Sequence, residues 1–182
     1  FPPLPLFVRH KVFVSYYHYD DQIYKEHFIK SFKHLFIDKS VGVGEINTDI
    51  STEYIKRLIR EDYITDSSVL IVLIGPNTWG RKHVDWEISA ALSAKAGGYS
   101  GLMGIFLPSF PLQANGQWIG TIPWRLYDNV QSGYASLYYW NQLCATETSV
   151  INAIESAYKS RTSLCDRIRN GRVQMSRNEV GI

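Results

Sequence analysis

Hydrophobic residues in this chain form short continuous runs separated by helical spacings. The clearest run is Val69–Ile74, six apolar residues, mostly β-branched and closed by Gly-Pro. Such a run is typical of a strand that is covered on both faces, as in parallel sheets. Further strands are predicted at Lys11–Tyr17 and Leu102–Leu107. The stretches Pro123–Val130 and Ala135–Trp140 are also predicted as short strands or a strand with a turn.

Four helices are predicted between and after these runs. They cover His18 to about Phe36, Thr48–Ile64, Asp85–Ala96 and Ser149–Thr162. In the first helix, the expected apolar stripe consists of Ile23, His27, Ile29, Phe32 and Phe36. In the third helix, Asp85 is the expected N-cap, which places Glu87 in the first turn.

The segment Ile37–Asn47 gives the weakest pattern. It predicts a short edge strand around Val41–Ile46, followed by a helix whose start is marked by Ser51 or Thr52. The glycines of Gly42-Val43-Gly44 lack the third glycine of a dinucleotide-binding pattern and do not open a helix. They are interpreted as a turn.

Strands that alternate with helices imply crossover connections and a parallel sheet. We expect an α/β fold of the flavodoxin-like, doubly wound type, with a mainly parallel five-stranded sheet. Its crevice should lie between the ends of the first and third strands. The chain divides into an extended N-terminal segment (1–10), one domain (11–162) and a basic C-terminal tail (163–182).

Composition narrows the class of protein. A net charge of +2 over 182 residues argues against a protein that binds the phosphate backbone of nucleic acids. No apolar run is long enough to span a membrane. Two cysteines without a CxxC spacing point to a cytoplasmic protein. Five arginines against two acids after position 160 make the tail basic, and we interpret it as a solvated end.

The predicted topology brings polar and aromatic residues together at one edge of the sheet. The first strand ends in Ser15, Tyr16 and His18, and the third is followed by Asn77 and Trp79. The next helix adds Trp86 and Glu87. This set contains one carboxylate, but neither a metal cluster nor a glycine-rich phosphate loop, so no metal or cofactor is expected.

A single carboxylate limits the chemistry. Ordinary glycosidases use two, because a poor leaving group must be protonated. Nicotinamide leaves NAD⁺ as a neutral molecule, so no general acid is needed, and one carboxylate can stabilise the cation that forms at the ribose. Glu87 also has a simpler interpretation as an acid favoured by the helix dipole.

Three motifs together resemble a known family. KVFVSYYHYDD, SSVLIVLIGPNTW and HVDWEISAA are similar to the TIR-like domain of bacterial Thoeris anti-phage systems, the ThsB type, over roughly Lys11–Leu107. The Trp-Glu-Ile motif after the GPNTW loop is the most specific part.

The resemblance implies an enzyme, an NAD⁺ nucleosidase and ADP-ribosyl cyclase in which Glu87 is catalytic. Ser15, Tyr16, His18, Asn77, Trp79 and Trp86 would bind NAD⁺, which is the substrate. The cyclic ADP-ribose-type product would activate a separate effector protein. The chain would also form a homo-oligomer, and a phage-derived molecule would trigger it. The alternatives are a non-enzymatic TIR-like adaptor that self-associates and, more weakly, a receiver or flavin-binding domain of flavodoxin type.

Overall fold

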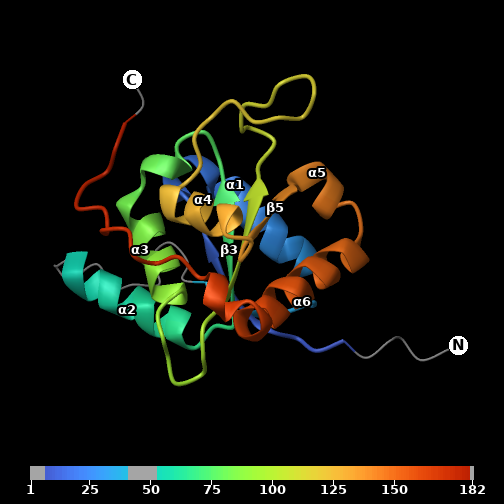
Figure 1. Ribbon diagram of the computed structural model, residues 1–182. Coiled ribbons are helices and arrows are strands. Elements are labelled where there is room, and N and C mark those ends of the chain that lie inside the picture. The colour runs from blue at the N-terminus through green and yellow to red at the C-terminus, as the bar shows by residue number, and fades with distance from the viewer. Residues whose placement is uncertain (1–6, 41–52, 181–182) are drawn as a thin grey trace, which may run out of the picture.

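A five-stranded parallel sheet forms the centre of the computed structural model, which describes residues 7–40 and 53–180 (Figure 1). The strand order is β2-β1-β3-β4-β5, and all four neighbouring pairs are parallel. The strands are β1 (Lys11–Ser15), β2 (Ile37–Asp38), β3 (Val69–Ile74), β4 (Gly101–Phe106) and β5 (Ser136–Tyr139). This order is that of flavodoxin-like folds and confirms the predicted fold class.

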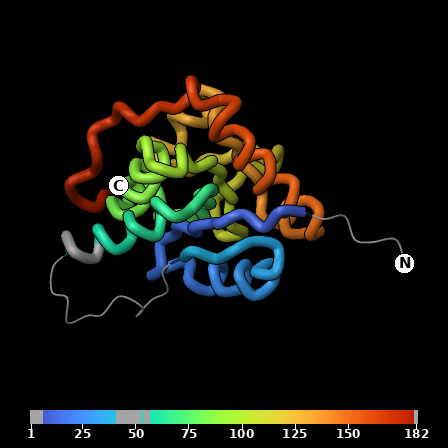
Figure 2. The backbone as a smooth tube through the Cα atoms, turned by 90° about the horizontal axis from the view of Figure 1, so that it is seen from below, coloured from blue at the N-terminus to red at the C-terminus, as the bar shows by residue number. Residues whose placement is uncertain are grey.

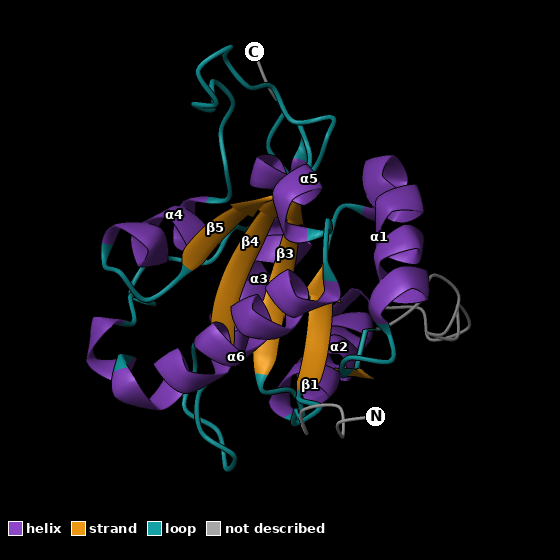
Figure 3. Ribbon diagram, turned by 90° about the vertical axis from the view of Figure 1, so that its right-hand side faces the viewer, coloured by secondary structure: helices purple, strands orange, loops and turns teal. Residues whose placement is uncertain are grey.

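Helices cover both faces of the sheet. They are α1 (His18–Phe32), α2 (Glu53–Thr65), α3 (Lys82–Ala91), α4 (Trp124–Gln131), α5 (Trp140–Leu143) and α6 (Glu147–Ser163), with 3₁₀ turns at Thr78–Gly80 and Cys165–Arg167. Helices α1, α5 and α6 share one core cluster, and α2, α3 and α4 share the other (Figure 3). Within the described residues, no helix has the length and apolarity needed to cross a membrane.

The central strands match the sequence prediction closely. All residues of β3 and β4 are buried, because both faces of these strands pack against helices. At Gly101 a Cβ atom would lie 2.1 Å from the carbonyl oxygen of Ala157. Only glycine at this position lets α6 approach β4 so closely.

The first helix differs from its prediction. It ends at Phe32, and its buried residues are Asp21, Lys25, Phe28 and Phe32. The predicted apolar stripe was wrong for Ile23, which is 71% exposed, and for His27, which is also exposed. The aromatic rings of Phe28 and Phe32 dominate burial and turn this face of the helix toward the sheet.

Two predicted elements on the other face were also wrong in part. Helix α3 begins at Lys82, so Asp85 is not its N-cap and Glu87 lies in the second turn. Pro123–Val130 contains helix α4, not a strand. Its buried residues, Arg125, Leu126 and Asn129, follow a helical period, but two of the three are polar, so they form no apolar stripe from which a helix could be predicted.

The predicted second strand around Val41–Ile46, the turn at 42–44 and the helix start at Ser51 or Thr52 lie outside the described residues, as does most of the N-terminal segment. The strand that pairs with β1 is Ile37–Asp38, at one edge of the sheet.

Most described side chains of the C-terminal tail are exposed and none of them is buried, as expected for a solvated end, but the tail is also held against the protein surface. After α6 the chain crosses the α2–α3–α4 face and runs beside α3 (Figure 2). Backbone and side-chain hydrogen bonds hold it there. Met175 donates its N–H to Asp85 and accepts from the Trp86 indole, and Glu179 donates its backbone N–H to the carbonyl oxygen of Gly80.

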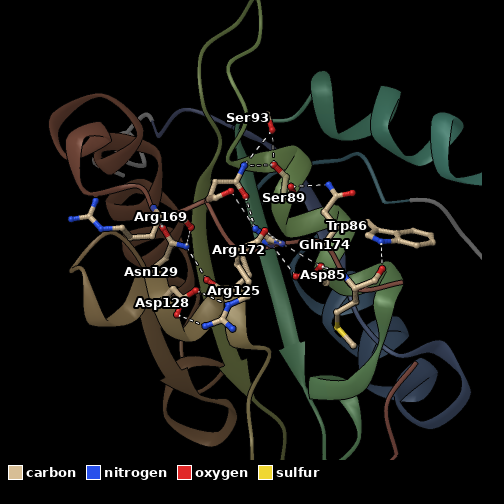
Figure 4. A network of polar contacts seen from close by, with 12 residues as sticks. Asp85, Trp86, Ser89, Ser93, Arg125, Asp128, Asn129, Arg169, Arg172 and Gln174 are labelled. Carbon is tan, nitrogen blue, oxygen red and sulfur yellow. Dashed lines mark hydrogen bonds and ion pairs between the residues drawn. The ribbon is translucent and has the colours of Figure 1, made fainter. Parts of the chain in front are cut away.

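Arg125 is the centre of this contact (Figure 4). Its side chain is fully buried, and its guanidinium donates to both carboxylate oxygens of Asp85 at 2.9 and 3.4 Å. It also donates to Asn170 and to the carbonyl oxygen of Arg172. The tail thus supplies acceptors that a buried guanidinium requires, and α3, α4 and the tail form one polar network.

Candidate active site

A cavity of about 170 Å³ lies between α2, α3 and the start of α1. Its lining residues are His18, Glu53, Arg57, Arg60, Glu61, His83, Trp86 and Glu87. Pockets that hold a whole small molecule usually measure about 300–1,000 Å³. This cavity therefore has room for one part of a dinucleotide.

Glu87 is the buried acid of this cavity. It is 3% exposed, and its Oε1 accepts a hydrogen bond of 2.8 Å from Arg60 of α2. Within the described part of the chain, Oε2 has no hydrogen-bond partner. Because Glu87 is in the second turn of α3, the helix-start explanation of this acid does not apply. A buried carboxylate needs another explanation, since burial of a charge is costly.

Trp86 forms one wall of the cavity. The guanidinium of Arg57 lies 4.4 Å from the centre of its ring, and the Lys82 ammonium lies at 5.3 Å. Its indole N–H donates to the carbonyl oxygen of Met175 at 2.8 Å. The indole is thus fixed from both sides, by two cations and by the C-terminal tail.

Of the three residues predicted at the end of β1, one lines the cavity. His18 lines it, whereas Ser15 and Tyr16 are not among the lining residues. Tyr16 is 7% exposed, and its hydroxyl donates to Gln22 at 2.6 Å. Burial raises the pKa of Tyr16 to about 12, so its hydroxyl stays protonated at neutral pH.

Asn77 and Trp79, in the loop after β3, do not line the Glu87 cavity. The Asn77 side-chain amide donates to Asp20 at 2.8 Å, at the start of α1. Trp79 lines a separate cavity of about 230 Å³, where its ring centre lies 6.1 Å from that of Trp124. The structure therefore brings together His18, Trp86 and Glu87, but not the other four predicted residues.

Three residues of the cavity that carry its chemistry were missed. Arg57 and Arg60 lie on α2, and His83 precedes Glu87 by one helical turn. The i, i+4 spacing of His83 and Glu87 was visible in the sequence, but the late predicted start of α3 hid it. Arg60 is 27 positions from Glu87, and no local pattern indicates that pair.

Asp21 gives a testable pH dependence at the ends of β1 and β3. It is 2% exposed, and its closest side-chain partner is the Thr78 hydroxyl at 3.4 Å. Burial, followed by the charge of Asp20, raises the pKa of Asp21 to about 6. The folded state therefore holds a proton between about pH 4 and 6 that the unfolded chain has lost, so stability falls as pH rises through this range.

We expect Asp21→Asn to remove this loss. The variant keeps an oxygen for Thr78 and has no proton to release, so it should gain about 1–3 kcal/mol over wild type between pH 4 and 7. Urea denaturation at both pH values measures the change. The exposed Asp62→Asn variant is the control, and a wild-type pH slope in Asp21→Asn would contradict the assignment.

Among the described residues, no cluster of three or more His, Cys, Asp or Glu side chains could hold a metal ion. The cavity is instead lined by two arginines, two histidines, one indole and three carboxylates, so the expectation of a single carboxylate was wrong: Glu53 and Glu61 of α2 also line it. Its chemistry is therefore that of ionic contacts, proton transfer and contact with a flat ring.

Comparison with known proteins assigns the part of the chain that contains the cavity to one family. The family model of the TIR-like domain of the Thoeris protein ThsB matches residues 13–110, more than half of the chain. The match runs from β1 past the end of β4 and includes every residue that lines the Glu87 cavity. A search of curated proteins finds no match.

Proposed function

The chain belongs to the family of TIR-like domains of the Thoeris protein ThsB, a component of anti-phage defence, and on this premise we propose that its Glu87 cavity cleaves NAD⁺ between nicotinamide and ribose. The main support for this proposal is the position of Glu87. It is a buried carboxylate in a cavity large enough for part of a dinucleotide. Burial strengthens its interaction with a cation, because the local dielectric constant is low.

The chemistry needs one carboxylate at the ribose. As the bond between the ribose carbon and the nicotinamide nitrogen breaks, its electron pair goes to nicotinamide, which leaves neutral. Positive charge then develops on the sugar, and Glu87 stabilises it electrostatically. Arg60 holds one carboxylate oxygen, so the other is the one that faces the ribose.

The remaining residues of the cavity bind the substrate. Arg57 and Arg60 place two guanidinium groups beside Glu87, and guanidinium groups bind phosphate oxygens well. Trp86 presents a fixed aromatic surface to a flat ring. His18 stands at the opening of α1, on the side of β1.

The ribosyl cation then reacts with a hydroxyl group. Attack by water gives linear ADP-ribose, and attack by a group of the same molecule gives a cyclic product. Consistent with the family, the cyclic product would serve as a signal for a separate effector protein, and a phage-derived trigger would raise its production.

Mass spectrometry of the product tests this proposal. Purified protein is incubated with NAD⁺, with and without extract of phage-infected bacteria. We expect free nicotinamide together with a cyclic product one water lighter than ADP-ribose. Linear ADP-ribose alone would contradict cyclisation, and unchanged NAD⁺ in both samples would contradict the enzymatic function.

A further inference from the structure

His83 occupies a position from which it can act in the same reaction. It lines the cavity with Glu87, and the two residues are one turn apart on α3. Side chains four residues apart on a helix lie on the same face, about 5–6 Å apart at their Cβ atoms. The ring centre of His18, which also lines the cavity, lies 6.1 Å from that of His83.

One hydrogen bond determines which nitrogen of His83 carries the proton. The Nε2 atom lies 3.1 Å from the carbonyl oxygen of Tyr16, at the end of β1. A carbonyl oxygen only accepts hydrogen bonds, so Nε2 must be the donor. In the neutral ring the lone pair is then on Nδ1, which has no hydrogen-bond partner within the described residues.

The surroundings of His83 favour this neutral form. Burial lowers the pKa of His83 below its ordinary value of 6.5. Glu87 and the hydrogen bond to Tyr16 act in the opposite direction, and the positive charges of Arg60 and His18 act with burial. The net effect is a ring that is neutral at pH 7 and therefore able to accept a proton.

We propose that His83 is the general base of the second half of the reaction, an inference that rests on the proposed cleavage of NAD⁺. After nicotinamide has left, the oxygen of a hydroxyl group bonds to the ribosyl cation. The proton of that hydroxyl passes to Nδ1 of His83, and the imidazolium then releases a proton to solvent. The hydroxyl belongs to water or to a sugar of the same molecule.

If His83 is this base, it is needed for one of the two reactions of the ribosyl cation but not for the other. Capture by a hydroxyl requires that a proton be removed, whereas recapture by nicotinamide does not, because the ring nitrogen attacks with its lone pair. Loss of the base should therefore slow product formation and leave nicotinamide exchange intact. A purely structural role of His83 would impair both reactions together.

The variant His83→Gln tests the proposal. Its side-chain amide can still donate to Tyr16, but it cannot accept a proton as imidazole does. We expect net product formation to fall about 10²- to 10⁴-fold. Exchange of labelled free nicotinamide into NAD⁺ should continue at a rate close to that of wild type. His34→Gln is the matched control, because His34 is exposed and pairs with Glu147 on the opposite face of the sheet.

The outcomes distinguish the two proposals. If wild type neither releases nor exchanges nicotinamide, cleavage of NAD⁺ is wrong and this role of His83 is wrong with it. If wild type cleaves NAD⁺ and His83→Gln forms product at the wild-type rate, or loses exchange as well, only the role of His83 is wrong.

Nitrogen-15 NMR of the histidine rings gives a readout that needs no turnover. We expect the neutral ring with its proton on Nε2 at pH 7, and a pKa below 6.5. A proton on Nδ1, or a charged ring at pH 7, would overturn the proposal.

Discussion

Arg125→Met is expected to lower the free energy of unfolding by about 3–5 kcal/mol. Methionine fills much of the same space, but it leaves the buried carboxylate of Asp85 without its cation. The carbonyl oxygen of Arg172 and the side chain of Asn170 lose their donor as well. Chemical denaturation measures the loss, and hydrogen exchange should show the tail released from α3.

Arg172→Met is the control for this prediction. The side chain of Arg172 is 41% exposed and pairs with Asp128 at the surface, where an ion pair contributes at most about 1 kcal/mol. Its backbone contact to Arg125 remains. Equal losses in the two variants would show that the Asp85–Arg125 pair does not hold this face together.

Glu87→Gln is expected to slow nicotinamide release from NAD⁺ about 10²- to 10³-fold, the usual effect of removing one group that stabilises charge in the transition state. Glutamine retains an oxygen that can accept from Arg60, so the cavity should keep its shape. What it loses is the negative charge beside the ribose. The effect should therefore fall on kcat, with KM changed little.

The control is Glu147→Gln, an exposed acid on α6, across the sheet from α3. It should release nicotinamide at the wild-type rate. The adaptor alternative makes a different prediction: neither variant would alter turnover, because there would be none. A Glu87→Gln enzyme as fast as wild type would remove Glu87 from the mechanism.

The sheet could be predicted because its central strands are recognisable from their own residues, without knowledge of the residues they pack against. Val69–Ile74 is apolar at every position, mostly β-branched and followed by Gly-Pro, which together are typical of a strand buried on both faces. The segment of helix α4 was predicted as a strand because the buried residues of the helix include Arg125 and Asn129. Both are polar, and they have hydrogen-bond partners in the tail. A pattern of hydrophobicity cannot show that a polar residue is buried.

The site was predictable where it depends on one segment. Trp86 and Glu87 were found because they lie together in one motif on α3. Arg60 was not found, because its contact with Glu87 depends on how α2 packs against α3. Asn77 and Trp79 were expected in the crevice, but the 3₁₀ turn Thr78–Gly80 buries Thr78 and leaves Trp79 in another cavity.

Release of nicotinamide from NAD⁺ labelled in the nicotinamide ring shows whether Glu87 cleaves the bond to ribose. Wild type and Glu87→Gln are incubated with the labelled substrate and with extract of phage-infected bacteria, and free nicotinamide is separated by chromatography. We expect wild type to convert the label to free nicotinamide and Glu87→Gln to leave nearly all of it in NAD⁺. Label that stays in NAD⁺ with wild type, or that is released equally by both proteins, would contradict it.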